Sequence, residues 1–364
     1  MGRLLDYEQM LGLITPCARE ISASWDDVNL ASGDDNYVQK IGNYFLDFHA
    51  QLIHRPELSG LVESSGSKAN ERALKIAKAK TGKSKVLVSN LAHSSIQDAA
   101  VGQKDFFVGI GLEPVIVYAD PTNGFQVDED DLSAKISKHG KDIAVVVSTY
   151  GTTPLGHAEN LAIRDSVKQL RKDGAWLHID AAYGGCYTLF STLITPTLPL
   201  ADSYTLDPYK FVGKPGASLL LTDARNLRKG IIPYYEISPL TVDTTLSFGP
   251  VVAWIQMIKD YERAGLRELA NDCIVEARLA AATLRNAGIK VVYGPKMSVV
   301  PVALPSAAAA KYIRENLKQS GFKVGKLHLE GDNYLIDGFR FTVTPRVPEF
   351  HKVRELTSTI IKMI

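Results

Sequence analysis

The stretch LHIDAAYGGCY, from Leu177 to Tyr187, places a single carboxylate between an apolar run and a string of small residues. An apolar segment that ends on one acid is typical of a buried strand that delivers the charge to a ligand at the carboxyl edge of a parallel sheet. Aspartate is also a common helix-cap and turn residue, so this stretch alone leaves both interpretations of Asp180 open. The rest of the chain decides between them.

Short β-rich segments alternate with helical ones from about residue 60 onward, which predicts an α/β domain built on a mostly parallel sheet. The helical segment 67–82 opens with a serine and closes with a glycine, and 128–140 begins with acids that suit a helix N-terminus. Most of the β-rich segments are continuously apolar, which indicates that both faces of the sheet are covered. The predicted strands are 60–65, 84–90, 114–120, 143–151, 176–182, 202–207 and 217–223.

The pattern changes beyond Pro250, where a long helical region over 251–288 leads into short strands, a helix and a final helix. This order predicts a smaller α+β domain at the C-terminus. We therefore expect an N-terminal arm or helical segment over 1–45, a large α/β domain over 46–255 and a small α+β domain over 256–364.

The composition favours a small-molecule partner. The 41 basic and 40 acidic residues give a net charge of +1, so no global field favours nucleic acid or an anionic membrane. No apolar run is typical of a signal peptide or long enough to span a membrane. Three scattered cysteines without a CxxC pair predict neither a disulfide framework nor a zinc site, and no metal site is expected. A cytoplasmic protein fits these features best.

The segment SYTLDPYKFVGKPGA, residues 203–217, places Lys210 after the next predicted strand, thirty residues beyond Asp180. Neighbouring parallel strands open on the same edge of a sheet, so we expect the acid and the lysine to lie near each other. A lysine is usually an exposed surface charge. Beside an acid at such an edge it can instead be a Schiff-base amine, which holds a cofactor that the acid tunes.

Five segments place this pair in a specific context: ESSGSKANERALKIAK, HSSIQDAA, STYGTTPLG, HIDAAYGG and DSYTLDPYK. Their order and approximate spacing resemble the fold-type I pyridoxal-phosphate enzymes. Within these, the chain resembles the group II amino-acid decarboxylases, especially the compact archaeal and bacterial tyrosine/aspartate decarboxylases, and more distantly sphingosine-phosphate lyase. The resemblance covers about residues 30 to 260 and, weakly, the rest of the chain.

The resemblance implies a fold, a cofactor and a reaction. The fold is the fold-type I α/β architecture, with a mostly parallel seven-stranded sheet in the large domain and a small C-terminal α+β domain. The cofactor is pyridoxal 5'-phosphate. The reaction is decarboxylation of an L-amino acid to the amine and carbon dioxide, by way of an external aldimine and a quinonoid, in a homodimer whose active site is shared between the subunits.

The resemblance also assigns roles around the cofactor ring. Lys210 holds the cofactor as an internal aldimine and later carries a proton. Asp180 pairs with the pyridine nitrogen and keeps it protonated, so that the ring can accept electrons. Ala182 lies under the ring, where only a small side chain fits, and His93 stacks on the other face.

For the cofactor phosphate, the resemblance implies a cradle at a strand-to-helix turn. Ser65, Gly66 and Ser67 supply hydroxyls, N–H groups and the positive end of a helix. Ser203 and Tyr209 add further bonds, with Tyr209 in place of the histidine that commonly precedes the lysine. An ordinary capped helix start is the structural alternative, and both can hold together.

The remaining roles concern the substrate. Thr152 is expected near the cofactor oxygen or the substrate carboxylate, and Arg340 at the α-carboxylate, for which a guanidinium fork is well suited. A structural salt bridge is the alternative for Arg340, and Arg346 competes with it for the role. Tyr235 is the expected general acid on a mobile loop, with Tyr234 beside it, although adjacent tyrosines are also ordinary interface residues.

Other functions stay open on the sequence. A carbon–carbon lyase or an aminotransferase would use the same cofactor and break a different bond. A nucleotide-binding protein is disfavoured, because the glycine pattern at Gly109 to Gly111 precedes a strand instead of following one, and the chain has no GxxxxGK motif. A catalytically silent scaffold with the same fold is a further alternative.

Overall fold

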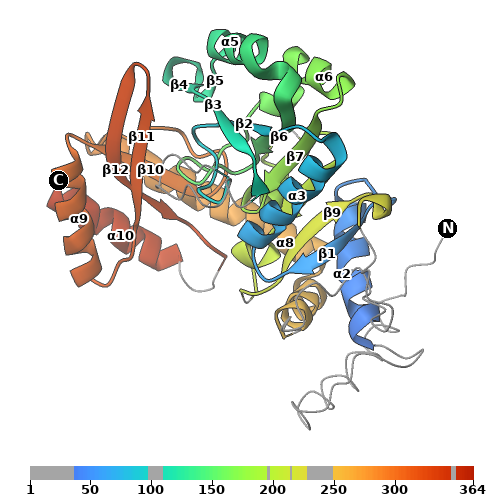
Figure 1. Cartoon of the computed structure of the whole chain (residues 1–364). Helices are drawn as coiled ribbons and strands as arrows, with labels where there is room; N and C mark the ends of the chain where they lie inside the picture. Colours follow the sequence, from blue (N-terminus) through green and yellow to red (C-terminus); the bar gives the residue numbers. More distant parts are fainter. Residues whose placement is uncertain (1–36, 97–109, 195–196, 214, 228–248, 346–349) are drawn as a thin grey trace.

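Two sheets organise the chain, one of seven strands and one of three, and they lie side by side (Figure 1). This computed structural model describes residues 37–96, 110–194, 197–213, 215–227, 249–345 and 350–364. The strand order in the larger sheet is β1-β9-β8-β7-β6-β2-β3. Its strands are β1 (Ser59–Glu63), β2 (Lys85–Ser89), β3 (Glu113–Val117), β6 (Ile143–Thr149), β7 (Trp176–Ala181), β8 (Ser203–Leu206) and β9 (Ser218–Thr222).

Five neighbouring strands of the larger sheet, from β8 to β3, run parallel. The exception in the sheet is β9, which is antiparallel to both of its neighbours, β8 and β1. Each predicted strand range overlaps one of the seven strands, so the mostly parallel seven-stranded sheet is confirmed. Every residue of β6 is buried, as its continuous apolar run predicted.

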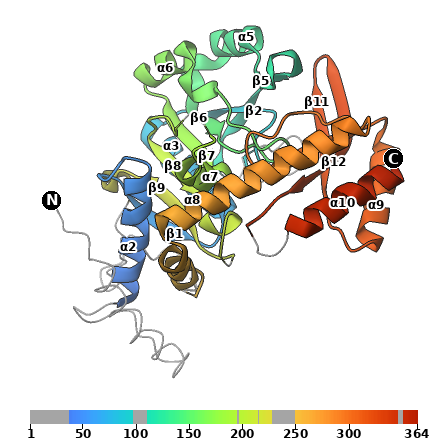
Figure 2. The same ribbon diagram turned by 180° about the vertical axis from the view of Figure 1, so that it is seen from behind.

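Helices cover both faces of this sheet. Helix α3 (Gly66–Thr81) lies on the face toward the viewer in Figure 1, and the long α8 crosses the opposite face in Figure 2. Helix α3 begins where the Ser65 side chain accepts a hydrogen bond from the N–H of Lys68, and it ends at Gly82, whose φ is 68°. The other helices of this part are α2 (Tyr37–Leu52), α5 (Glu129–His139), α6 (Asp165–Lys172) and α7 (Gly184–Phe190).

Helix α8 (Gly249–Asn286) joins the two sheets. It is interrupted at Glu262, where φ is 49°, and its longer part runs from the back of the large sheet to the small one (Figure 2). The predicted boundary between residues 255 and 256 falls inside α8, and the one after residue 45 falls inside α2. The division into three parts stays a prediction.

The smaller sheet has the order β10-β12-β11 and is antiparallel throughout. In it, β12 is the central strand and pairs Arg340 with Pro301 and Gly325. A two-stranded ribbon, β4 (Ala119–Asp120) with β5 (Gln126–Val127), follows β3. The elements of the C-terminal part are β10 (Val299–Leu304), α9 (Ala307–Gln319), β11 (Gly325–Gly331), β12 (Tyr334–Thr342) and α10 (Phe350–Met363).

The two faces of β7 differ in chemistry, although both are buried. Leu177, Ile179 and Ala181 join the main hydrophobic core, where each fully buried Leu or Ile contributes roughly 1.5–3 kcal/mol. The alternate residues are Trp176, His178 and Asp180, and His178 and Asp180 are hydrogen-bonded to Asn70 of α3. A buried polar stripe is costly unless every group in it finds a partner, so this face is where a function is expected.

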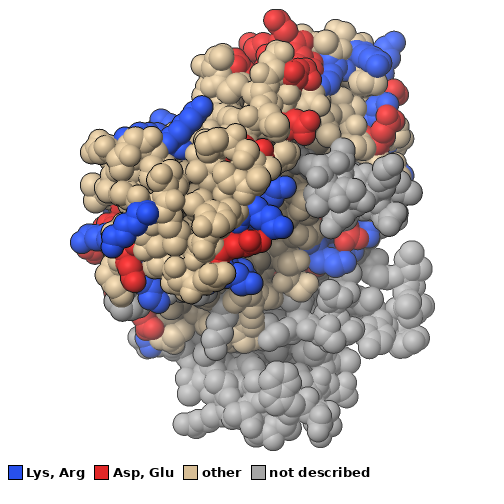
Figure 3. All heavy atoms as spheres, turned by 90° about the vertical axis from the view of Figure 1, so that its left-hand side faces the viewer, with Lys and Arg blue, Asp and Glu red and all other residues tan. Residues whose placement is uncertain are grey.

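Basic and acidic side chains are interspersed on the face shown in Figure 3. Among the described residues, no helix is long and apolar enough to cross a membrane.

Candidate active site

Two glycine turns hold the carboxyl ends of β6 and β7 together. A Cβ on Gly184 would lie 2.3 Å from the carbonyl oxygen of Tyr150, and Gly151 has φ 93° and packs against the backbone of Gly184. Only glycine permits this approach of backbone to backbone. The N–H of Tyr150 also donates to the carbonyl of Asp180 at 2.8 Å, which fixes the end of β7.

Asp180 is buried at this edge, with 3% of its surface exposed. The N–H of Ala182 donates to its Oδ1 at 3.1 Å, and Asn70 Nδ2 donates to its Oδ2 at 3.0 Å. The bond from Ala182 is the local turn contact that aspartate often makes, so the turn interpretation holds as well. The bond from Asn70 comes from helix α3, which packs on the sheet. The two donors together stabilise the negative charge of the carboxylate.

Lys210 ends a short 3₁₀ turn, Pro208–Lys210, directly after β8. Its Nζ lies 2.9 Å from Oδ2 of Asp207, whose side chain is fully buried, while the Lys210 side chain is 33% exposed. Burial works to lower the pKa of Lys210, but the charge and contact of Asp207, with help from Asp180 and Tyr209, outweigh it and raise that pKa. The amine is therefore held as a cation beside Asp207, on a side chain that is partly buried.

His93 lies in the loop after β2. Its Nδ1 accepts a hydrogen bond from the N–H of Ser95 at 3.1 Å, so a neutral ring carries its proton on Nε2. Burial lowers the pKa of His93, the Asp180 and Asp207 charges raise it, and the charges of Lys210 and Arg340 lower it. These four charged groups act on one imidazole, so the structure gathers them around it.

The start of α3 forms a polar surface beside Asp207, the partner of Lys210. A Cβ on Gly66 would lie 2.5 Å from Oδ2 of Asp207, so only glycine fits there. Gly66 and Ser67 supply the N–H groups at the start of the helix, and Ser67 is exposed, whereas the N–H of Lys68 is taken by the Ser65 hydroxyl that caps the helix. The buried hydroxyl of Ser218 lies beside the Tyr209 phenol.

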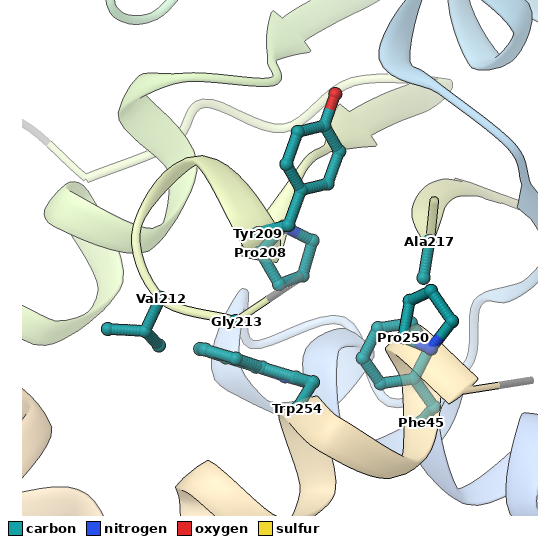
Figure 4. A pocket seen from close by; sticks show the side chains of 8 residues that line it. All are labelled: Phe45, Pro208, Tyr209, Val212, Gly213, Ala217, Pro250 and Trp254. Atoms are coloured by element: carbon teal, nitrogen blue, oxygen red, sulfur yellow. The ribbon is translucent and has the colours of Figure 1, made fainter. Parts of the chain in front are cut away.

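Tyr209 borders this surface. Burial raises the pKa of its phenol, and the Asp207 charge adds to the effect. One side of the residue lines a narrow crevice with Trp254 and Pro250 that has no room for water, and the hydroxyl points away from it (Figure 4). The crevice is therefore a packing defect, and the hydroxyl is directed elsewhere.

Arg340 reaches the site from the small sheet. Burial lowers the pKa of its guanidinium, and Nη1 donates to the carbonyl of Lys326. The described residues provide no carboxylate partner for it, which disfavours the structural salt bridge within that part of the chain. A half-buried guanidinium that has no anion among the described residues is suited to a substrate carboxylate.

Two predicted residues are not brought to the open part of the site. Thr152 is fully buried, and its hydroxyl is 2.7 Å from Nδ1 of His157. Ser203 begins β8 at the far end from Lys210, and its hydroxyl contacts Trp176 and His178. Predictions for Tyr235, Tyr234 and Arg346 lie outside the described residues.

Sequence analysis missed Asn70, His178 and Asp207. The last two could have been found, because residues 176, 178 and 180 of β7 and residues 203, 205 and 207 at β8 alternate along two paired strands. Asn70 belongs to another element, and no local pattern links it to Asp180.

The site combines a carboxylate that accepts hydrogen bonds at both oxygens, a lysine at the next strand end, an imidazole and the start of a helix. This combination suits an aldehyde cofactor that carries a phosphate and a ring nitrogen. The residues fit pyridoxal phosphate: the helix start and Ser218 suit its phosphate, Lys210 its aldehyde and Asp180 its ring nitrogen. The chain belongs to the pyridoxal-dependent decarboxylase family, whose conserved domain matches residues 66–290, well over half of its length. It is a pyridoxal-phosphate enzyme of the amino-acid decarboxylase group.

Individual relatives agree with the family. A probable L-tyrosine/L-aspartate decarboxylase of Methanothermobacter thermautotrophicus is 26% identical over 328 residues, which are 85% of this chain and 85% of the relative. An L-2,4-diaminobutyrate decarboxylase of Acinetobacter baumannii is 36% identical over 152 residues, which are 40% of this chain and 28% of the relative.

Solved structures show the same fold. The glutamate decarboxylase of Lactobacillus brevis superposes with a TM-score of 0.75 at 16% identity, covering 100% of this chain and 93% of that one. The sphingosine-1-phosphate lyase of Burkholderia pseudomallei has a TM-score of 0.69 at 16% identity, covering 100% of this chain and 92% of that one. The predicted fold-type I architecture is confirmed.

Replacing Asp207 by Asn tests whether this carboxylate sets the charge on Lys210. The amide keeps the shape of the side chain and removes its charge. The lowering effect of burial on the pKa of Lys210 is then no longer outweighed by Asp207, so that pKa falls. At neutral pH more of the amine is unprotonated, and it reacts several-fold faster with acetic anhydride. The measurement is labelling of the cofactor-free protein across a pH series, read by mass spectrometry of the peptide that carries Lys210.

Lys85 serves as the internal reference in the same digest, because its partner Glu113 is unchanged. Equal labelling of Lys210 in both proteins contradicts the role of Asp207.

Proposed function

We propose that the chain decarboxylates an L-amino acid with Lys210 as the cofactor-binding lysine and Asp180 as the partner of the ring nitrogen. The observation that carries this proposal is the juxtaposition at one sheet edge. Asp180 lies at the end of β7 with both oxygens bound by donors, and Lys210 follows the adjacent strand β8 with its side chain partly exposed. When bound, pyridoxal phosphate supplies the electron sink that takes the electron pair released from Cα.

The residues of the chain have distinct parts in this reaction. Asp180 holds a proton on the ring nitrogen by presenting a buried negative charge to it. Lys210 carries protons on Nζ, with Asp207 as its counter-charge. His93 presents a neutral ring, because Nδ1 is occupied by Ser95 and burial lowers its pKa. A neutral ring can lie flat against the cofactor without repelling its protonated nitrogen.

The phosphate is assigned to the start of α3. Gly66 and Ser67 offer N–H groups and an exposed hydroxyl, and the positive end of the helix favours the phosphate charge. Ser218 and Tyr209 are further candidates beside them. Ser65 contributes by fixing the helix start, and Ser203 is left out because its hydroxyl lies at the other end of β8.

Thr152 is assigned a supporting part. His157 donates its Nε2 proton to the carbonyl of Phe125 at 2.9 Å, so its Nδ1 is an acceptor and the Thr152 hydroxyl donates to it. That hydroxyl can then accept a hydrogen bond but has no proton left for a carboxylate. We therefore give Thr152 a supporting part through its bond to His157, and place Arg340 alone at the substrate α-carboxylate.

The protein is further inferred to act as a cytoplasmic homodimer with a shared active site. The described cysteines, Cys186 and Cys273, are free and buried, which suits a reducing compartment. Tyr235 remains the predicted proton donor to the substrate carbon, with Tyr234 as its neighbour. The side chain of the substrate is open among those of the relatives, namely tyrosine, aspartate and 2,4-diaminobutyrate.

The reaction and the lysine can be tested together. Purified protein supplied with pyridoxal phosphate should be yellow, and borohydride should fix the cofactor on Lys210. A screen of amino acids, including those named for the relatives, should release carbon dioxide and a primary amine in equal amounts, and Lys210→Ala should abolish both. The measurements are peptide mass spectrometry and quantification of gas and amine.

A label on Lys214 instead of Lys210 contradicts the site. Formation of a keto acid without carbon dioxide would indicate an aminotransferase, and cleavage of a phosphorylated amino alcohol to an aldehyde would indicate a lyase.

Arg340 is tested by its effect on substrate binding. Arg340→Ala removes a charge-assisted contact worth about 1.5–3 kcal/mol, so KM should rise by roughly 10- to 100-fold. Arg340→Lys keeps the charge but loses the bidentate geometry of the guanidinium, so its KM should lie between those of the wild type and Arg340→Ala. Steady-state kinetics give both values.

The amine product is the control ligand, because it lacks the α-carboxylate. Its inhibition constant should be the same in wild-type and R340A proteins. Equal loss of affinity for substrate and product would assign Arg340 to the structure of the pocket.

A further inference from the structure

A continuous chain of hydrogen bonds runs from Trp176 to Asp180 behind the candidate site. Trp176 Nε1 is 2.8 Å from Ser203 Oγ, which is 2.8 Å from Nδ1 of His178. His178 Nε2 is 3.1 Å from Asn70 Oδ1, and Asn70 Nδ2 is 3.0 Å from Oδ2 of Asp180. Four polar residues take part in this series of hydrogen bonds, and all are buried: Asn70, His178, Asp180 and Ser203.

The direction of every bond in this chain follows from its two ends. A carboxylate only accepts, so the amide nitrogen of Asn70 faces Asp180 and its oxygen faces His178. That oxygen only accepts, so His178 carries a proton on Nε2. Burial lowers the pKa of His178 to about 4, so the ring is neutral and Nδ1 accepts from the Ser203 hydroxyl.

The far end agrees with this order. The indole nitrogen of Trp176 is a donor only, and the Ser203 oxygen that has given its proton to His178 still accepts from it. Each group therefore donates toward Asp180, from an indole that cannot accept to a carboxylate that cannot donate. Hydrogen bonds aligned in one direction polarise one another in a buried environment.

We propose that Asn70, His178, Ser203 and Trp176 are positioning residues, which deliver a one-directional series of hydrogen bonds to Asp180 and hold its carboxylate aimed at the cofactor ring nitrogen. This inference rests on the proposed function, because it gives Asp180 its catalytic partner. It goes further by assigning a purpose to four residues that do not touch the reacting atoms.

Packing alone is a poor explanation for the series. Residues 176, 178 and 203 stand on strands whose other faces are filled by apolar side chains, and apolar residues of similar size would fill these positions without any polar group to satisfy. Asn70 also donates toward Ser95 Oγ at 3.3 Å, and Ser95 in turn binds His93. The same amide thus links Asp180, assigned to the ring nitrogen, with His93, assigned to one face of the ring.

The first test needs no cofactor. In protein labelled with ¹⁵N-histidine, the His178 ring should show the neutral tautomer with its proton on Nε2, and it should stay neutral below the ordinary histidine pKa of 6.5. The signal is assigned by its loss in His178→Gln. A proton on Nδ1, or a charged ring near pH 6.5, overturns the inference.

The second test uses the loaded enzyme and separates positioning from folding. Ser203→Ala breaks the series in the middle and should lower kcat several-fold, with KM and cofactor affinity unchanged, whereas Ser203→Thr restores the hydroxyl and should recover kcat. Asn70→Leu removes a bond to a charged group and should lower kcat on the order of 10-fold or more. The pH dependence of visible absorbance should shift in S203A and N70L alike.

Ser148→Ala is the matched control, since Ser148 is a buried serine of the neighbouring strand β6 whose Oγ accepts from the N–H of Ala162 at 3.3 Å. Its kcat and spectrum should equal those of wild type. Wild-type kcat in S203A and N70L overturns the inference and leaves the proposed function intact. The expected His178 tautomer in a protein that decarboxylates no amino acid supports the series and removes the proposed function instead.

Discussion

A carboxylate without solvent is the constraint on which this structure depends. Asp180 is buried at the end of a central strand, where an unpaired charge would be prohibitive, so the surrounding elements must supply donors to it. Helix α3 provides Asn70, and the turn after β7 provides the N–H of Ala182. The glycines that bring β6 and β7 together, and the small residues on the buried face of α3, follow from the same need for close approach.

The two faces of the large sheet differ in polarity at β7 and β8, and this difference provides the donors for Asp180. One face of β7 and β8 is apolar and packs in the main core, and the other is polar and meets α3. The apolar face stabilises the fold by burying apolar side chains. The polar face contributes hydrogen bonds that fix one orientation of Asp180. Lys210 and Asp207 extend the same pattern to the end of β8, where a buried acid keeps the amine of a partly buried lysine charged.

The sequence was enough to predict the strands, the cofactor class and the position of Asp180 and Lys210 at neighbouring strand ends. Each of these depends on a local pattern: an apolar run, a motif, or a residue at a strand end. The contacts of the Ser203 hydroxyl with Trp176 and His178 could not be predicted, because a motif gives the order of residues and not the end of the strand on which a side chain lies. Asn70 was out of reach, since its contact with Asp180 joins residues 110 positions apart. The alternation of Trp176, His178 and Asp180 was visible, but the apolar residues between them concealed it.

The central claim is that the buried charge of Asp180 drives the chemistry, and Asp180→Asn tests it most directly. The amide keeps the size of the side chain and removes the charge. We expect the loaded variant to retain the cofactor on Lys210 while carbon dioxide release from the best amino acid falls on the order of 100-fold or more. Release at the wild-type rate, with the cofactor still bound, would contradict the account.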